Sequence, residues 1–188
     1  MLIDGRVETA GRCRDGRAAA SHDGRDAGAR TRLQCVSHHA APSRCHGGVL
    51  GWGSYILSDQ NTLSVALREL AILRTGALRR CEYEFLRHAV IARQHGFTDE
   101  VLHAIAVGDR TPLTDEMAMV MKAVDELVVE GRIAPDTFER IRSTFGDHTA
   151  IDIVWTVGQY SQVCMFLLTA GVEPDPDVAD DPLRPLFA

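Results

Sequence analysis

Six aliphatic residues recur at intervals close to 3.6 around residues 64–79, and this pattern limits the possible folds more than any other feature of the chain. They are Leu63, Leu67, Leu70, Ile72, Leu73 and Leu78. Such a period places side chains along one side of an α-helix, whereas a half-buried strand would show alternation at every second residue. No convincing alternating segment occurs anywhere in the sequence. We therefore predict an all-α fold of roughly seven helices joined by short connections.

Capping residues mark most of the expected helix ends. The predicted helices begin at about Ser64, Cys81, Thr98, Thr114, Pro135 and Thr149. Glycines that suit a helix C-terminus follow four of them, at Gly96, Gly108, Gly146 and Gly171. The apolar segment at residues 49–57 is less certain to be helical, because its glycines disfavour a helix.

Composition divides the chain into three parts. Residues 1–30 are rich in Arg, Gly, Ala and Asp and hold no Val, Leu or Ile after Val7. So little apolar surface cannot offset the entropy of ordering, and we expect disorder, or alternatively a misassigned start or reading frame. Residues 31–173 carry the helical pattern and form the predicted folded domain. Residues 174–188 are rich in proline and are expected to be an extended or disordered tail.

Charge and cysteine usage narrow the functional class. A net charge of -6 argues against a nucleic-acid partner, which needs a basic face. The apolar stretch at residues 151–168 contains Gln159, Ser161 and Gln162, so we predict a buried helix and no membrane association. The N-terminus lacks the apolar core of a secretory signal. Five cysteines without a CxxC motif suggest free thiols in the cytoplasm.

Three titratable residues share one stripe of the helix predicted to begin at Cys81. Cys81, Glu84 and His88 stand at positions i, i+3 and i+7, with Phe85 and Ala92 on the same side. The apolar neighbours indicate that the stripe faces inward. Burying titratable groups costs free energy unless they are paired or used in chemistry. We therefore take this stripe as the candidate catalytic site.

The segment Leu67–Arg74, which contains Glu69, followed by Cys81–Phe85 and His88, resembles the carboxymuconolactone decarboxylase-like family. Alkylhydroperoxidase D belongs to the same superfamily. The resemblance extends over roughly residues 33–172. It implies an all-helical fold that assembles as a homotrimer or homohexamer, with the site between packed helices near the subunit contacts.

One departure from the family motif affects the expected chemistry. The peroxidase branch carries a distant glutamate followed by Cys-x-x-Cys-x-x-x-His, which Glu69, Cys81 and His88 match. Glu84 occupies the position of the second cysteine, which attacks peroxide in those enzymes. A carboxylate can neither attack peroxide nor form a disulfide. The resemblance therefore does not transfer the dithiol mechanism to this chain.

The decarboxylase branch implies a different use of the same residues. Its substrate is a lactone with a β-keto-acid-like arrangement, and loss of CO2 leaves an enolate that must be protonated. We expect His88 to transfer the proton, with Glu84 as its partner one turn earlier and Glu69 as a second carboxylate. The predicted function is thus a carboxy-lyase-like enzyme acting on a small carbonyl, lactone or β-keto acid. Two alternatives remain open, namely a thiol-dependent peroxidase using Cys81 and a non-catalytic oligomer that binds a small molecule.

Other residues with suitable chemistry fit the site less well. Arg74 or Arg87 would suit a substrate carboxylate, but their helical phase does not clearly match the site stripe. Cys164 lies in an apolar run and is expected in the core. No standard metal site is matched by the spacing of His38, His39 and His46. We expect no metal and no cofactor, and a small organic acid or a peroxide as substrate.

Overall fold

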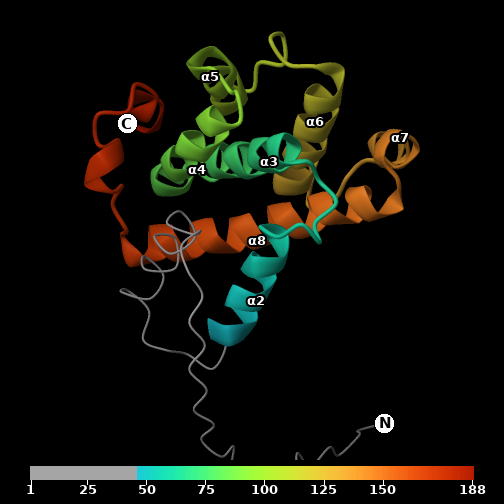
Figure 1. Ribbon diagram of the computed structural model, residues 1–188, viewed down its shortest axis with the longest axis horizontal. Helices are drawn as coiled ribbons and strands as arrows, with labels where there is room; N and C mark the ends of the chain where they lie inside the picture. The colour runs from blue at the N-terminus through green and yellow to red at the C-terminus, as the bar shows by residue number, and fades with distance from the viewer. Residues whose placement is uncertain (1–45) are drawn as a thin grey trace, which may run out of the picture. The chain divides into compact units, whose positions relative to one another are not determined.

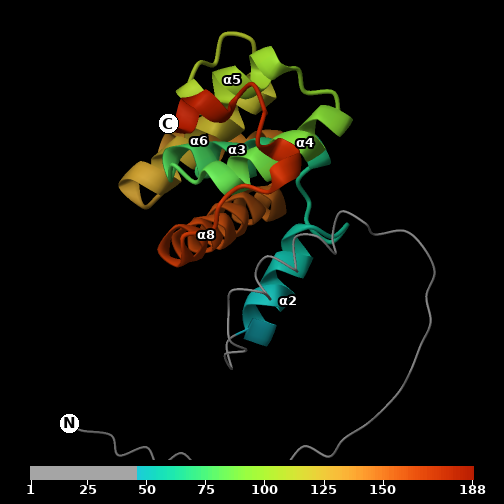
Figure 2. The ribbon, with the colours of Figure 1, turned by 90° about the vertical axis from the view of Figure 1, so that its left-hand side faces the viewer.

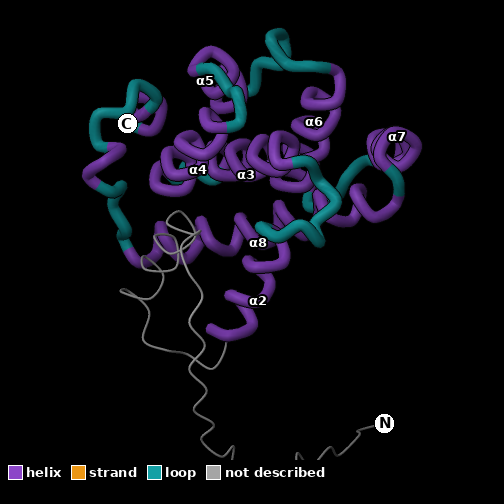
Figure 3. Tube along the Cα trace, viewed as in Figure 1, coloured by secondary structure: helices purple, strands orange, loops and turns teal. Residues whose placement is uncertain are grey.

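The computed structural model describes residues 46–188, and this part of the chain is all-helical, with no strand (Figures 1 and 3). Its seven α-helices are α2 (His46–Ile56), α3 (Val65–Leu78), α4 (Glu82–Gln94), α5 (Asp99–Val107), α6 (Asp115–Glu130), α7 (Pro135–Phe145) and α8 (Asp147–Ala170). Two short 3-10 helices follow, η1 (Pro176–Val178) and η2 (Arg184–Phe187). The predicted all-α fold class is confirmed, while the predicted disorder of residues 1–30 lies outside the described residues.

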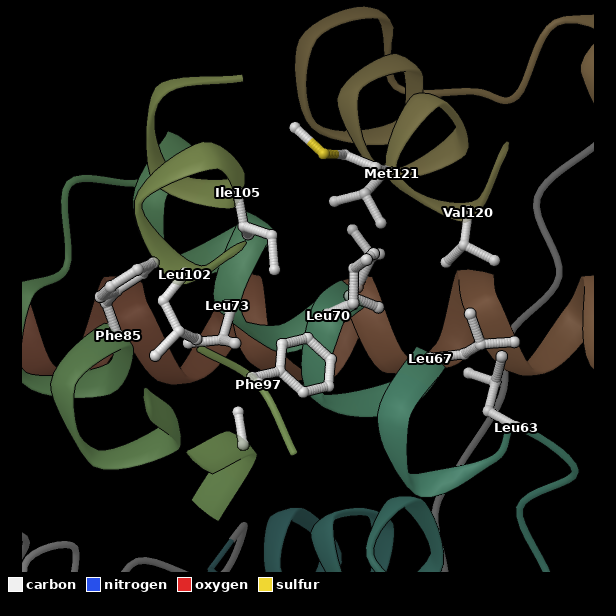
Figure 4. Packing of buried hydrophobic residues seen from close by; sticks show 14 of the residues in the cluster. Leu63, Leu67, Leu70, Leu73, Phe85, Phe97, Leu102, Ile105, Val120 and Met121 are labelled. Carbon is white, nitrogen blue, oxygen red and sulfur yellow. The ribbon is translucent and has the colours of Figure 1, made fainter. Parts of the chain in front are cut away.

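Helix α3 is the centre of the fold, because it packs against α4, α5, α6 and α8. Its N-terminus is capped by the Ser64 hydroxyl, which accepts a hydrogen bond from the Leu67 amide at 3.3 Å. Successive residues Leu70, Ala71, Ile72 and Leu73 are all buried, so apolar side chains leave α3 in every direction. Figure 4 shows Leu70 and Leu73 among side chains from α4, α5 and α6.

The turn between α3 and α4 holds these two helices in close contact. A side chain at Gly76 would place its Cβ atom 3.4 Å from the backbone nitrogen of Phe85, so glycine permits this approach. Arg80 takes a left-handed conformation with φ of 54°, and the Cys81 amide donates to the Gly76 carbonyl at 2.9 Å. Cys81 is thereby placed as the N-cap residue of α4.

Helix α8 is long and apolar enough to cross a membrane by length and composition alone. In this fold it packs instead against α2, α3, α6 and α7 (Figures 1 and 2). Its buried side chains follow a three- and four-residue spacing, at Ile153, Val157, Tyr160, Cys164 and Leu167. It therefore contributes one face to the core of the helical domain.

Two further differences from prediction come from contacts between distant segments. The glycine-rich segment does form helix α2. Gly53 and Gly158 let α2 approach α8 closely, because a Cβ atom at Gly53 would lie 3.4 Å from the Gln159 side chain and one at Gly158 would lie 3.5 Å from the Trp52 ring. The tail is not extended or disordered, so that expectation is wrong. Its prolines begin two 3-10 turns, and Val178 and Leu183 are buried in the main core.

Candidate active site

Glu69 and His88 form a buried pair that joins α3 to α4. The Glu69 Oε2 atom lies 2.6 Å from His88 Nδ1, and each side chain is only 1% exposed. An ionised carboxylate can only accept a hydrogen bond, so with Glu69 ionised the Nδ1 atom carries the proton. The pair therefore fixes both the orientation and the tautomer of the imidazole, and leaves Nε2 as the nitrogen available for proton transfer.

Glu84 lies on the other side of the same imidazole. Its Oε1 atom is 3.6 Å from His88 Nε2, one helical turn away on α4. This distance is too long for a hydrogen bond, and the buried Nε2 atom has no hydrogen-bond partner within the described part of the protein. The Tyr160 ring from α8 meets the imidazole edge-on, with centroids 4.9 Å apart. His88 thus has a carboxylate near each nitrogen, but only Glu69 is bonded to it.

Cys81 lies at the start of α4, where its thiol interacts with that of Cys164 on α8. A hydrogen bond from the Cys164 thiol lowers the pKa of Cys81, against the opposing effect of burial. The backbone N–H of Glu84 also favours the thiolate, while the Glu84 carboxylate charge disfavours it. Donating that bond from a buried position raises the pKa of Cys164. The sequence analysis did not anticipate this second thiol beside Cys81.

The two arginines considered for substrate binding are occupied elsewhere. Arg74 pairs with Asp125 at 2.6 Å and donates to the carbonyls of Ile105 and Ala106 at 2.9 and 3.0 Å. It therefore ties α3 to the C-terminal end of α5 and to α6. Arg87 pairs with Asp177 of the tail at 2.7 Å. Both arginines have structural roles within the domain.

A separate hollow lies between the end of α2 and the first half of α8. Its volume is about 560 Å³, and its lining includes Trp52, Tyr55, His148, Asp152 and Trp155. None of the four predicted site residues lines it. The proton-transfer residues are instead enclosed between α3, α4 and α8.

The structure brings together all four residues predicted for the site, namely Glu69, Cys81, Glu84 and His88. It adds Tyr160, and also Cys164, which the sequence analysis assigned to the core. Their spacing of four residues indicates a shared face of α8, but only the packing shows that this face meets α4. His38 and His39 lie outside the described residues, and the expectation of no metal or cofactor stays a prediction.

The comparisons with known proteins agree with this architecture. A solved structure from Agrobacterium tumefaciens has a similar all-helical fold and matches with a TM-score of 0.64. That protein is of unknown function and is named as an AhpD-type candidate for antioxidant defence. It shares 17% sequence identity over 70% of this chain and 91% of its own, which shows a common fold only. No functionally curated protein matches the sequence significantly.

The family model for the carboxymuconolactone decarboxylase family matches residues 47–126. This segment runs from α2 into α6 and includes Glu69, Cys81, Glu84 and His88. The family match over this segment and the shared fold together support a place in the carboxymuconolactone decarboxylase and AhpD-like superfamily.

Proposed function

We propose that the protein is an enzyme that performs general acid–base chemistry on a small carbonyl compound, lactone or β-keto acid. Decarboxylation, or a related proton transfer at the carbon next to a carbonyl, is the reaction class. The observation that supports this proposal is the imidazole of His88 with a carboxylate near each nitrogen, Glu69 at 2.6 Å and Glu84 at 3.6 Å. Pairs of carboxylates around one histidine suit the transfer of a proton to an enolate carbon.

Each residue has a distinct role in the proposed reaction. When the carbon–carbon bond to the leaving CO2 breaks, its electron pair stays on the substrate as an enolate. His88 delivers a proton from Nε2 to the enolate carbon and is then reprotonated from solvent. Glu69 stabilises the charged imidazolium through Nδ1, and Glu84 is placed to orient the substrate or relay the proton. Such assistance is typically worth about 10²–10⁴-fold in rate.

The route to the imidazole follows from differences in burial. The Glu84 side chain is 9% exposed, whereas those of Glu69 and His88 are 1% exposed. A small substrate would therefore approach from the Glu84 side, where Nε2 also lies. A compact organic acid suits this enclosed position better than a polymer does.

Proton exchange in D2O tests the proposal on a panel of compounds from the proposed substrate class. Small β-keto acids and lactone acids are followed by NMR for deuterium uptake next to the carbonyl and for CO2 release. The wild-type protein should accelerate at least one substrate, and His88→Asn should lower that rate by about 10²–10⁴-fold. His148→Asn is the matched control, because His148 is exposed. Undiminished turnover by His88→Asn would contradict the assignment.

A thiol-dependent peroxidase is the second candidate, and the lowered pKa of the Cys81 thiol favours it. Cys81→Ser separates the two candidates, because it should leave the acid–base reaction nearly unchanged and abolish peroxide turnover. A protein that shows neither activity in wild-type form would support the remaining alternative, a helical oligomer that binds a small molecule.

We also propose that the protein is a homotrimer or homohexamer in the cytoplasm. Four apolar side chains of α8 that are about half exposed support an interface, namely Ile151, Trp155, Met165 and Leu168. Light scattering coupled to size-exclusion chromatography would measure the assembly. A monomer at micromolar concentration would contradict this part of the proposal.

A further inference from the structure

The hollow between the end of α2 and the first half of α8 is walled by aromatic side chains. Trp52 and Tyr55 line it from α2, and Trp155 lines it from α8. The two indole rings meet edge to face, with centroids 5.9 Å apart and ring planes at 85°. Trp155 is 50% exposed, so much of its surface is open to a ligand. Electron-rich rings grouped in this way attract positively charged ligands.

Asp152 gives the same hollow a buried carboxylate. This residue lines the hollow and is only 3% exposed. Its Oδ1 atom accepts a hydrogen bond from the Tyr55 hydroxyl at 2.6 Å, and its Oδ2 atom accepts from the amide and the hydroxyl of Thr62 at 2.7 Å each. An ionised carboxylate only accepts hydrogen bonds, so three donors directed at one side chain are the surroundings of a charged Asp152.

No cationic side chain neutralises this carboxylate within residues 46–188. None of the ion pairs formed there includes Asp152. The other carboxylate of the lining, Asp147, is paired with Arg142. A buried charge usually has a partner of opposite sign, because removing a charge from water is costly. Asp152 therefore leaves the hollow with a negative charge that a ligand can complement.

We propose that this hollow binds a small organic ammonium ion with apolar substituents. The positive charge lies beside the aromatic rings and near Asp152, and the substituents contact Trp155 and Ile151, which is 46% exposed. The volume of about 560 Å³ is within the range of small-molecule sites. A metal ion fits less well, because one unpaired carboxylate supplies too few oxygen ligands, and the described residues contain no group of three metal-ligating side chains.

The proposed ligand differs in charge from the proposed substrates of the acid–base reaction. Organic acids are negatively charged, and the Asp152 carboxylate repels them. None of the residues placed at the candidate active site lines the hollow. The hollow is therefore a second binding site with the opposite charge preference, and its occupation does not depend on the chemistry at His88.

Three probes of nearly the same shape test the charge preference of the hollow. Choline is positive, 3,3-dimethylbutanol has carbon in place of its quaternary nitrogen and is neutral, and 3,3-dimethylbutanoate is negative. Trp52 and Trp155 are the only tryptophans of the chain, so tryptophan fluorescence reports on this hollow alone. The full-length protein is titrated at about pH 8, where histidine is neutral. Choline should bind at least about tenfold more tightly than the alcohol, and the butanoate should give no saturable response.

Two variants separate the contributions of charge and ring. Asp152→Asn removes the charge but keeps an acceptor for Tyr55, so choline should bind about tenfold more weakly while the affinity for the alcohol stays the same. Trp155→Leu keeps an apolar side chain but removes the ring, and it should also weaken choline binding, with Trp52 still reporting. Glu100→Gln is the matched control, because it removes one exposed carboxylate on α5 and should bind as wild type does. Circular dichroism shows whether each variant is folded, and the comparison of three probes on the wild type needs no variant.

Two results would overturn the proposal. One is equal affinity for choline and the neutral alcohol, which would leave only apolar contact. The other is no saturable response of the wild type to choline. If acrylamide then also fails to quench the tryptophans, a second copy of the chain covers the hollow instead, since Ile151 and Trp155 also belong to the proposed subunit interface. Both results are independent of deuterium uptake by β-keto acids, so failure of this site and failure of the acid–base function can be told apart.

Discussion

Removing the imidazole of His88 should destabilise the protein by an amount that can be worked out from the site. His88→Ala deletes the 2.6 Å hydrogen bond to Glu69 in a place where both side chains are 1% exposed. A hydrogen bond to a charged group is worth about 1.5–3 kcal/mol. Loss of the edge-on contact with Tyr160 adds about 1 kcal/mol. The expected loss is therefore about 2.5–4 kcal/mol.

His88→Asn isolates the contribution of that hydrogen bond. An asparagine amide can donate from nearly the position of Nδ1, so it keeps a bond to Glu69 but loses the ring. It should be more stable than His88→Ala by about 1.5–3 kcal/mol, although it cannot transfer a proton. Since His148 is exposed, His148→Ala should stay within about 0.5 kcal/mol of wild type.

Guanidinium unfolding at pH 7, followed by far-UV circular dichroism, measures these differences. For a chain of this length, a loss of about 2.5–4 kcal/mol corresponds to a fall in Tm of roughly 5–16 °C. The reasoning would be refuted if His88→Ala and His88→Asn were equally stable, because the bond to Glu69 would then contribute nothing.

Three more predictions concern charged and thiol groups. Arg74→Met should cost about 2–4 kcal/mol in a urea melt, because carbonyls at the end of α5 lose a buried donor. Burial acts to raise the pKa of Asp181, but the hydrogen bond from Arg93 holds it below its usual value. This stabilisation is present above the unfolded pKa and is lost as pH falls through the folded one, so Asp181→Asn should be destabilising at pH 7 and less so as the pH is lowered into the acid range in thermal melts. Cys164→Ala removes the donor to Cys81, so iodoacetamide should alkylate Cys81 more slowly at pH 7, and an unchanged rate would contradict the hydrogen bond.

Local sequence signals predicted most helix boundaries in the described part of the chain. Ser64, Thr98 and Thr114 each cap the helix that they were expected to begin, because capping depends on residues three positions apart. Helix α2 was harder to predict, since its glycines disfavour a helix while their small size allows contact with α8. Prolines in the tail suggested an extended chain, but Arg93 pairs with Asp181 at 2.6 Å and holds the tail on the domain.

The candidate site, like the fold, could be predicted where it depends on neighbouring residues of one helix, but not where it depends on contacts between distant helices. Helical spacing alone placed Cys81, Glu84 and His88 on one buried stripe, and the family resemblance added Glu69. The contact with Cys164 depends on how α4 lies against α8, which one sequence does not reveal. Cys164 could not be predicted beside Cys81 from the sequence, because α4 and α8 are separated by three other helices along the chain.

The contact between the tail and α4 has a practical consequence for purification. The Phe187 ring packs against Phe85 with centroids 5.0 Å apart, and Phe85 is the neighbour of Glu84 on α4. An affinity tag fused after Ala188 would begin two residues beyond Phe187, close to this contact with the helix that carries His88. Kinetic comparisons should therefore use protein from which any such tag has been removed.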